Sequence, residues 1–468
     1  MIKFGTDGWR AVIAEEFTFQ NVAIVTQALA DYLNSENFPN RTLAVGYDRR
    51  FLSDRFASQV AAQLVANDFQ ALLFDEAVPT PMVSFEVKTQ NLAAGIVITA
   101  SHNPPEFNGF KVKAPFGGSA PPEITQQIEA RLGQTPPKLM SFAEAITTGK
   151  VKAIQPSINY GRHIADLVDL EQIKASTAKI IVDPMHGSGA RWVEHLLSGG
   201  KCQVTTIRAN QDAYFGGVNP EPLAHHLQAL SESVRETSAL LGLATDGDAD
   251  RVGAVDEQGK FINSHQIVAI LLLHLAKVRK LSGAVAVTFS QSTLVKRIAK
   301  HFNLPIYETP IGFKYLADLM LTRNVLISGE ESGGIGIKGN IPERDGILNS
   351  LLLAEAIIAS GKTPSELLKS IWQEFGYFSY DRLDLPIEIE RGQAFVEKMK
   401  SDPPLEIAEE KIVDVATLDG TKLIFEDESW LLLRQSGTEP VLRLYCEASS
   451  EEKVEKLLSA ARELVKNY

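Results

Sequence analysis

LLGLATDGDADR, residues 240–251, joins a short apolar run to three carboxylates spaced two residues apart. The run 240–245 has the length and composition of a buried strand, and the polar loop follows it at once. The same order recurs along the chain, with helix-like segments of 3.6-residue period between the strands. Such alternation predicts an α/β fold. Five further runs predict buried strands: 42–47, 93–100, 179–183, 285–289 and 324–328.

The order of elements divides the chain into four parts. The stretches 1–148, 149–255 and 256–370 each combine strands, a polar loop and helices, which predicts three α/β domains. Residues 371–468 instead carry strand-like pieces and one amphipathic final helix, which predicts a smaller α+β domain. Ser449 and Glu452 have capping-box spacing at the start of that helix. Its apolar stripe comprises Val454, Leu457, Leu458, Ala461 and Val465.

Composition excludes several classes of protein. The chain of 468 residues has 46 basic and 58 acidic side chains, so its net charge of −12 disfavours nucleic-acid binding. The most apolar run, 267–276, is too short to span a bilayer. Two cysteines cannot build a disulfide framework, and the opening MIKFGTDGWR lacks the apolar core of a secretion signal. We therefore expect a cytoplasmic protein without nucleic-acid or membrane partners.

The loop 99–111, TASHNPPEFNGFK, follows a predicted buried strand. A strand that ends in this way places the Ser101 hydroxyl at the edge of the sheet where α/β proteins bind ligands. Ser101 is therefore a candidate nucleophile or phosphate carrier, and His102 and Lys111 are candidates for proton acceptor or counter-charge. The structural alternative is a Ser/Asn turn ahead of two prolines.

The carboxylates Asp246, Asp248 and Asp250 predict a metal site. Three hard oxygen donors suit Mg²⁺, and without a cation they would repel one another. A calcium EF-hand is excluded, because Arg251 stands where its glycine belongs and the flanks look like strands. A solvated acidic turn is the remaining alternative.

Two further loops carry polar groups. In GEESGGIG, 329–336, Glu330 and Ser332 can hydrogen-bond sugar hydroxyls; a dinucleotide site is disfavoured because no helix opens after GxGxxG. The alternative is a glycine-rich surface turn. In RQSGTE, 434–439, an arginine, two hydroxyls and a glycine predict an anion cradle, against the alternative of a plain hairpin turn. The residues of this cradle are Arg434, Ser436, Gly437 and Thr438, with Arg443 on the next strand.

Taken in order, TASHNPP, DGDADR, GEESGG and RQSGTEP resemble the motifs of the α-D-phosphohexomutase superfamily, the phosphoglucomutase and phosphomannomutase enzymes. The resemblance covers nearly the whole chain, including the opening GTDGWR at 5–10. It implies three related α/β domains with mixed sheets and a smaller C-terminal α+β domain around a central cleft. It also implies an intramolecular phosphotransferase that interconverts hexose 1-phosphate and hexose 6-phosphate through a phosphoserine and a 1,6-bisphosphate.

The resemblance implies a role for each matching residue. Ser101 resembles the phosphorylated serine, and it or its phosphate completes the Mg²⁺ shell of the three aspartates. Lys111 resembles the proton acceptor, which requires that cationic neighbours such as Arg10 lower its pKa. Arg10 and His102 resemble polar residues around the phosphoserine. The substrate contacts implied are Arg251, Lys314, Glu330, Ser332, Arg434, Ser436, Gly437, Thr438 and Arg443.

The loop sequences favour glucose as the sugar, with glucose 1,6-bisphosphate as intermediate and activator, in a monomer or dimer. A glucose 1,6-bisphosphate synthase, a phosphomannomutase and a phosphoglucosamine mutase are the enzymatic alternatives. A sugar-phosphate-binding regulatory protein is the non-enzymatic one. Phe313 and Gly334 stand where members of the phosphomannomutase/phosphoglucomutase subgroup often carry histidine, so a histidine acid–base role at those positions does not carry over.

Overall fold

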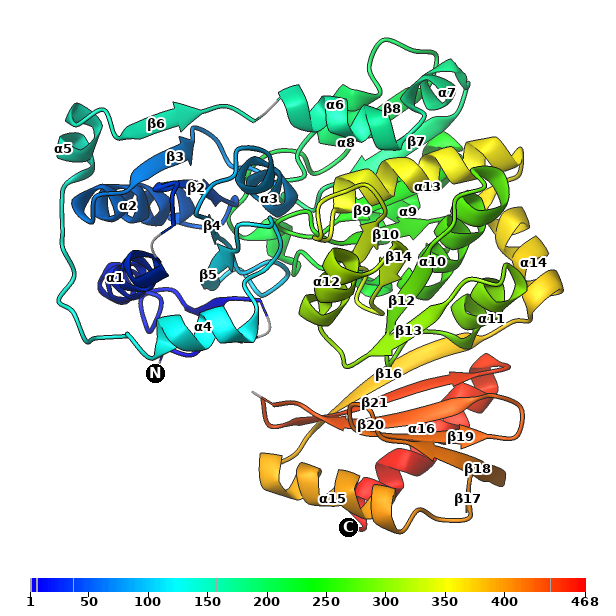
Figure 1. Ribbon diagram of the computed structural model, residues 1–468. Helices are drawn as coiled ribbons and strands as arrows, with labels where there is room; N and C mark the ends of the chain where they lie inside the picture. Colours follow the sequence, from blue (N-terminus) through cyan, green and yellow to red (C-terminus); the bar gives the residue numbers. More distant parts are fainter. Residues whose placement is uncertain (1, 6, 37, 157, 438) are drawn as a thin grey trace.

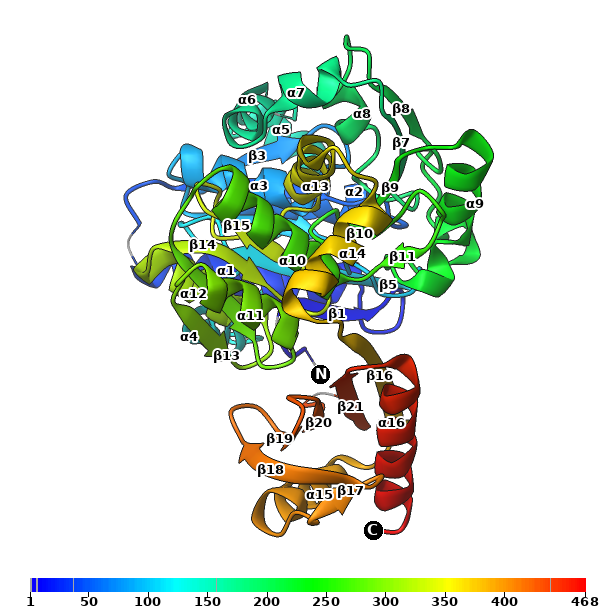
Figure 2. The same cartoon turned by 90° about the vertical axis from the view of Figure 1, so that its right-hand side faces the viewer.

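The chain folds into four units, each built on its own sheet (Figure 1). The structure, a computed structural model, describes residues 2–5, 7–36, 38–156, 158–437 and 439–468. In Figures 1 and 2 the first three units form one mass, and the fourth lies below them with the C-terminus. The predicted architecture of three α/β domains and a smaller C-terminal domain is confirmed.

The first sheet has the order β1-β5-β4-β2-β3-β6. The strands β2, β3, β4 and β6 are parallel, whereas β5 runs antiparallel to β4 and β1 antiparallel to β5. Its strands are β1 (Trp9–Val12), β2 (Thr42–Tyr47), β3 (Gln70–Phe74), β4 (Ala94–Ile98), β5 (Phe107–Lys113) and β6 (Val151–Ile154). Its helices are α1 (Phe19–Glu36), α2 (Ser53–Ala66), α3 (Thr80–Thr89), α4 (Pro122–Glu129) and α5 (Phe142–Thr147).

The second sheet has the order β11-β10-β9-β7-β8, with β8, β7 and β9 parallel, β10 antiparallel to β9, and β11 antiparallel to β10. Its strands are β7 (Lys179–Asp183), β8 (Gln203–Thr206), β9 (Leu241–Thr245), β10 (Val252–Val255) and β11 (Phe261–Ile262). Its helical segments are α6 (Ile158–Leu167), α7 (Leu170–Ala175), α8 (Trp192–Leu196), η1 (Phe215–Gly217), η2 (Ala224–His226) and α9 (Gln228–Thr237).

The third sheet has the order β13-β12-β14-β15, and β15 alone is antiparallel to its neighbour. Its strands are β12 (Ala284–Thr288), β13 (Ile306–Thr309), β14 (Val325–Gly329) and β15 (Ile335–Ile337). Its helical segments are α10 (Ser264–Leu273), η3 (His274–Val278), α11 (Thr293–His301), α12 (Phe313–Thr322), α13 (Gly346–Ser360) and α14 (Pro364–Phe375).

The fourth sheet is antiparallel, in the order β16-β21-β20-β19-β18-β17. Its elements are β16 (Ser379–Pro386), α15 (Ile389–Ser401), β17 (Glu406–Ile407), β18 (Glu410–Ala416), β19 (Thr421–Phe425), β20 (Trp430–Gln435), β21 (Val441–Ala448) and α16 (Glu451–Lys466). The five apolar residues predicted for the last helix are all buried on α16. Its N-cap is Ser450, which accepts from the backbone N–H of Lys453, so the predicted cap at Ser449 is wrong by one residue.

The three predicted domain boundaries differ from the ends of the units in the structure. Residues 151–154 form β6, which pairs with β3 of the first sheet, so the first unit extends past residue 148. Residues 261–262 form β11, which pairs with β10 of the second sheet, so that unit extends past residue 255. The boundary at 370 falls inside α14, and the fourth sheet begins with β16 at Ser379.

The first three units share an equivalent arrangement of loops. In each, a polar loop joins one strand of the parallel set to its antiparallel neighbour: β4 to β5, β9 to β10 and β14 to β15. These connections are the loops singled out in the sequence for Ser101, for the three aspartates and for Glu330. The fold therefore places the three loops at corresponding positions of three related sheets.

A shared apolar core joins the first three units into one body. A single apolar cluster includes residues of α3, β7, β9, α10, β12 and α13. Helix α13 is buried from Gly346 to Ile357 because α7, α10 and β9 surround it. The fourth unit has its own core between its sheet and α15 and α16. It meets the third unit through a smaller cluster of Phe289, Trp430, Leu432 and Tyr445.

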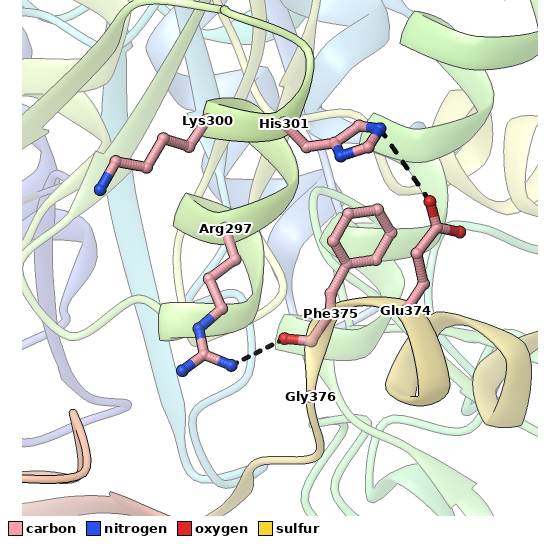
Figure 3. A pocket seen from close by; sticks show the side chains of 6 residues that line it. All are labelled: Arg297, Lys300, His301, Glu374, Phe375 and Gly376. Atoms are coloured by element: carbon pink, nitrogen blue, oxygen red, sulfur yellow. Dashed lines mark hydrogen bonds and ion pairs between the residues drawn. The ribbon is translucent and has the colours of Figure 1, made fainter.

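A pocket of about 500 Å³ lies beside the chain that enters the fourth unit (Figure 3). Its lining is Arg297, Lys300 and His301 of α11 with Glu374, Phe375 and Gly376 at the end of α14. Arg297 donates to the carbonyl oxygen of Phe375 at 2.9 Å and forms an ion pair with Glu428 of the fourth unit. The pocket thus belongs to the join between the third and fourth units and includes no predicted site residue.

Lys422 is buried in the same join. Its Nζ donates to the carbonyl oxygen of Phe289 at 2.6 Å and lies 4.0 Å from the ring centroid of Trp430. Burial and, to a smaller extent, the charge of Lys296 lower the pKa of Lys422 to about 7, against the raising effects of Glu308 and Glu447. Between pH 7 and the ordinary lysine value of 10.5, the unfolded chain therefore binds the extra proton.

We expect Lys422→Met to change how thermal stability depends on pH. In the unchanged protein, the contribution of Lys422 to the free energy of unfolding rises with pH above 7, by at most about 1.4 kcal/mol per pH unit. The melting temperature of the Met variant minus that of the unchanged protein should therefore fall between pH 7 and pH 9, measured by calorimetry. Lys411→Met, at an exposed position of the same sheet, is the control, and parallel curves for all three proteins would contradict the prediction.

None of the helices within the described ranges combines the length and apolarity needed to cross a bilayer.

Candidate active site

Ser101 lies in a strained turn directly after β4. Its φ is +53°, a left-handed conformation that few residues other than glycine adopt, and its side chain is buried. The backbone N–H of Ser101 donates to Thr99 Oγ1 at 2.9 Å, and Thr99 Oγ1 donates to Asp48 Oδ2 at 2.6 Å. The loop is therefore held in this conformation by side chains beneath it.

Arg50 holds the same loop from the end of β2. One terminal nitrogen donates to the carbonyl oxygens of Ser101 (2.7 Å) and Asn103 (2.6 Å), and the other donates to those of Pro104 (2.7 Å) and Phe107 (3.1 Å). Its Nε lies 3.2 Å from Asp48 Oδ2, with both side chains fully buried. Sequence reasoning missed this pair. The available signal was GYDRR, 46–50, a charged run at the end of a predicted parallel strand.

The three aspartates converge between β9 and β10. One oxygen from each lies within 4.8 Å of the others, and all three side chains are buried. Ala249 in this loop has φ +55°, and Asp246 Oδ1 accepts the backbone N–H groups of Asp250 (3.0 Å) and Arg251 (3.1 Å). The loop thus turns its carboxylates inward toward one point.

The serine and the aspartates meet. Ser101 Oγ donates to Asp246 Oδ2 at 2.8 Å, across 145 positions of the chain. Among the described residues, the buried oxygens Asp248 Oδ1 and Asp250 Oδ1 have no hydrogen-bond partner. Buried carboxylate oxygens without donors fit a hard divalent cation, which would satisfy them. The residues present therefore suit Mg²⁺.

The closeness of the three carboxylates changes the pKa values of Asp246 and Asp248. Burial raises the pKa of Asp246 well above its ordinary value, and the charges of Asp250 and Asp248 raise it further. Burial would also raise the pKa of Asp248, but the charge of Lys111 and hydrogen bonds from Lys111 and Thr80 outweigh it, so that pKa is lowered. The neighbouring cations therefore stabilise the ionised form of Asp248 but do not offset the cost of ionising Asp246.

Lys111, on β5, is surrounded by carboxylates. Its Nζ lies 2.8 Å from Asp7 Oδ2, 2.8 Å from Asp248 Oδ2 and 3.1 Å from Asp250 Oδ2. Burial alone would lower the pKa of Lys111, but these three charges raise it above its ordinary value. The condition for Lys111 to act as the base, that cationic neighbours lower its pKa, is therefore not met, because the fold brings three carboxylates to its nitrogen.

His102 and Arg10 flank the serine. Nδ1 of His102 lies 3.3 Å from Ser101 Oγ, and Arg10 Nη1 donates to Asn103 Oδ1 at 2.7 Å. Burial lowers the pKa of His102 well below its ordinary value, and the charges of Arg251 and Arg10 lower it further. A neutral imidazole thus lies next to the serine oxygen.

Arg344, which precedes α13, is a second cation that sequence reasoning missed. Its Nη2 lies 2.5 Å from Asp7 Oδ2 and 2.7 Å from Asp250 Oδ2. The signal was ERD, 343–345, three charges at the head of a strongly apolar segment. Asp7 belongs to the opening GTDGWR motif, but its ion pair with Arg344 depends on contact between the first and third units.

The Glu330 loop packs against the aspartate loop through a bridge between Gly334 and Arg251. Burial raises the pKa of Glu330 to about 7, against the lowering effect of Arg344. Ser332 is partly exposed. A side chain at Gly334 would overlap the Arg344 side chain, and the Phe313 ring lies 5.5 Å from the Arg344 guanidinium. Arg344 therefore lies between Gly334 and Phe313.

The predicted anion cradle lies on the fourth unit. Arg434 and Arg443 are paired positions of β20 and β21. Arg434 forms an ion pair with Asp419 (2.9 Å), and Arg443 forms one with Glu439 (2.9 Å). Ser436 is buried and Gly437 is exposed, whereas Thr438 lies outside the described residues. Lys314 is in the first turn of α12, with Nζ 5.0 Å from the ring centroid of Tyr315. The cradle is thus carried by a separate domain from the serine and the aspartates.

Comparisons with known proteins agree with this arrangement. Residues 1–137, 159–259 and 263–375 match the descriptions "Phosphoglucomutase/phosphomannomutase, alpha/beta/alpha domain" I, II and III, and residues 393–464 match the C-terminal domain of that family. A phosphoglucomutase/phosphomannomutase of Thermococcus kodakarensis is 32% identical over 463 residues, covering 99% of this chain and 98% of that protein. A phosphoglucosamine/phosphogalactosamine mutase of Sulfurisphaera tokodaii is 28% identical over 465 residues, covering 99% and 98%.

The fold comparison gives the same result. A crystal structure of a protein assigned as a phosphomannomutase from Thermus thermophilus superposes with a TM-score of 0.86 at 34% identity, covering 99% of each chain. The relatives are named as mutases of different hexose phosphates, so they support the enzymatic interpretation and leave the sugar open. The chain therefore belongs to the phosphoglucomutase/phosphomannomutase family and is a phosphohexomutase, an intramolecular phosphotransferase.

Proposed function

We propose that this phosphohexomutase interconverts glucose 1-phosphate and glucose 6-phosphate through a phosphorylated Ser101. The observation that carries the proposal is the 2.8 Å contact between Ser101 Oγ and Asp246, inside a cluster of three buried aspartates. A hydroxyl next to a divalent-cation site can carry a phosphoryl group whose charge the cation offsets. Asp246, Asp248, Asp250 and Ser101 would hold Mg²⁺, which supplies positive charge against the transferring phosphoryl group.

The proposed reaction has two balanced transfers. The phosphoryl group leaves Ser101 Oγ as its phosphorus bonds to the free sugar hydroxyl, whose proton passes to a base. The resulting glucose 1,6-bisphosphate turns around in the site. Its original phosphoryl group then moves to Ser101, and the proton returns to the sugar oxygen that is released. We propose His102 as this base, because its Nδ1 lies 3.3 Å from Ser101 Oγ. Lys111, held by three carboxylates, acts in this proposal as counter-charge.

The remaining site residues are proposed to hold the substrate. Glu330 and Ser332 are proposed to bind sugar hydroxyls. The phosphate that is not reacting is proposed to bind far from Ser101, which makes the cradle a positioning device. The residues proposed for phosphate contacts are Arg10, Arg251, Lys314, Arg434, Ser436, Gly437, Thr438 and Arg443.

The preference for glucose rests on the sequences of the GEESGG loop and of GFKY, 312–315. Mannose and glucosamine phosphates remain the alternative substrates, and release of the bisphosphate would make the enzyme a glucose 1,6-bisphosphate synthase. The relatives' names support a phosphosugar substrate and do not favour the regulatory alternative. A cytoplasmic location and a monomeric or dimeric state stay predictions.

The test is an assay of the 1-phosphates of glucose, mannose and glucosamine, each with and without its 1,6-bisphosphate, followed by ³¹P NMR. We expect glucose 1-phosphate to give the highest kcat/KM, with activation by bisphosphate and no net bisphosphate accumulation. Intact mass should show about 80 Da on the chain after incubation with the bisphosphate. A higher kcat/KM for another sugar would overturn the choice of glucose, and accumulating bisphosphate would favour the synthase.

A further inference from the structure

The turn between β18 and β19, residues 417–420, touches both sides of the join between the third and fourth units. Asp419 Oδ2 accepts Arg434 Nε at 2.9 Å and the backbone N–H of Ile311 at 2.8 Å. Arg434 belongs to the predicted cradle of the fourth unit, and Ile311 precedes α12 of the third. One carboxylate oxygen therefore accepts hydrogen bonds both from the predicted phosphate cradle and from the loop that leads to Lys314.

The local structure holds Asp419 in this place. Gly420 has φ +90°, and a side chain there would overlap the carbonyl oxygen of Leu433 and approach Arg434 Cα. The next residue, Thr421, pairs with Leu433 in the ladder between β19 and β20. The turn is thus packed against the strand that carries Arg434, and Asp419 moves with that strand.

The loop on the other side is equally short. Gly312 follows Ile311 with φ +134°, and α12 begins at Phe313 with Lys314 in its first turn. The bond from the Ile311 N–H therefore fixes the loop one turn away from the Lys314 backbone. Asp419 and Arg434 are both partly exposed, at 21% and 17% of their side-chain surfaces, so solvent and ligand can reach the pair.

Other contacts dock the fourth unit independently of Asp419. Lys422 Nζ donates to the carbonyl oxygen of Phe289, and the backbone N–H of Thr293 donates to Glu447 Oε1 at 2.8 Å. Removing the Asp419 charge therefore leaves the two units in contact. Its effect should be confined to the orientation of Arg434 and of the 310–314 loop.

We propose that Asp419 is a positioning residue that couples the orientation of Arg434 to the 310–314 loop, so that both hold the far phosphate of the bisphosphate in one geometry. The bond to Asp419 uses Nε, which leaves the two terminal nitrogens of Arg434 for a phosphate. This inference rests on the proposed function, because it concerns the same substrate cleft. If Asp419 acts in this way, it helps to retain the bisphosphate intermediate, which without Asp419 leaves the site more often before it turns around.

The test compares Asp419→Asn, Arg434→Ala and the double variant. Asparagine keeps the shape and one acceptor oxygen while removing the charge. We expect Asp419→Asn to raise KM for the sugar 1-phosphate roughly tenfold, as for the loss of one charge-assisted hydrogen bond. Free bisphosphate released per turnover, followed by ³¹P NMR, should rise several-fold. Arg434→Ala should weaken substrate binding and retention at least as much.

The double variant separates positioning from general damage. If Asp419 acts through Arg434, the double variant should be no worse than Arg434→Ala in KM and in bisphosphate release. Asp414→Asn, at an exposed acid on β18, is the matched control and should behave as the unchanged protein. An Asp419→Asn enzyme with unchanged KM and unchanged release would overturn the proposal, as would effects that simply add in the double variant.

The two proposals can fail separately. If the unchanged protein turns over none of the sugar 1-phosphates, the proposed function fails before Asp419 is tested. If the unchanged protein is active and Asp419→Asn equals the Asp414→Asn control, only the positioning role fails.

Discussion

Ser101→Ala should lower kcat by at least about four orders of magnitude while KM for the sugar phosphate changes little. The hydroxyl is the only part of the side chain that contacts Asp246, and alanine keeps the Cβ that packs in the turn. The proposed reaction passes through the serine oxygen twice, so its removal leaves no acceptor for the phosphoryl group. The measurement is steady-state turnover of glucose 1-phosphate with saturating bisphosphate.

Intact mass gives an independent readout of the same change. The unchanged chain should gain about 80 Da from the bisphosphate and the Ser101→Ala chain should not. Ser84→Ala, which removes another buried serine of the first unit, is the control for packing damage. A Ser101→Ala enzyme of near-normal turnover, or one that still gains the mass, would remove Ser101 from the role of phosphate carrier.

The second large effect is expected from Asp246→Asn. The amide keeps an oxygen for the backbone N–H groups of Asp250 and Arg251 but removes one of three negative charges. Loss of a ligand should weaken Mg²⁺ binding by more than about 100-fold, since losing only an outer-shell partner of a metal ligand costs about 10- to 100-fold. Turnover should fall at least as far, and chelation of the unchanged enzyme should abolish an activity that added Mg²⁺ restores.

The same variant should be more stable than the unchanged protein when no divalent ion is added. Burial and the neighbouring charges of Asp250 and Asp248 raise the pKa of Asp246, so its ionised form destabilises the folded state at neutral pH. Calorimetry in chelator is the check, with titration calorimetry for Mg²⁺ affinity. Asp256→Asn, at a buried aspartate after β10, should leave Mg²⁺ affinity unchanged. An Asp246→Asn protein that binds Mg²⁺ normally would exclude the aspartate cluster as the metal site.

Sequence reasoning succeeded where the signal was local. The predicted strands at 42–47 and 179–183 match β2 and β7 residue for residue, because short apolar runs bounded by turn formers specify buried strands. Asp246, Asp248 and Asp250 converge within one loop, so their spacing alone indicated a shared point. The cap of α16 was misplaced by one residue because Ser449 and Ser450 are both acceptable caps, and the choice depends on how β21 ends.

Reasoning failed where the answer lay in distant segments. Asp7 and Arg344 pair across 337 positions, and Arg50 reaches the Ser101 loop across 51. The pKa of Lys111 shifts in the direction opposite to the one that a proton acceptor requires, because Asp7 and two metal-loop aspartates lie within about 3 Å of its nitrogen. The boundary at 148 failed because β6 joins the first sheet by pairing with a strand about 80 residues earlier.

By itself, the sequence determined the layered α/β fold, the serine and the aspartate triplet, because strand periodicity and ligand spacing are properties of neighbouring residues. Only the tertiary structure decided that Ser101 meets Asp246, that Lys111 lies among carboxylates and that Asp419 bonds both sides of a domain join. These are contacts between units whose relative placement depends on the summed packing of many side chains, and no short stretch of chain encodes that sum.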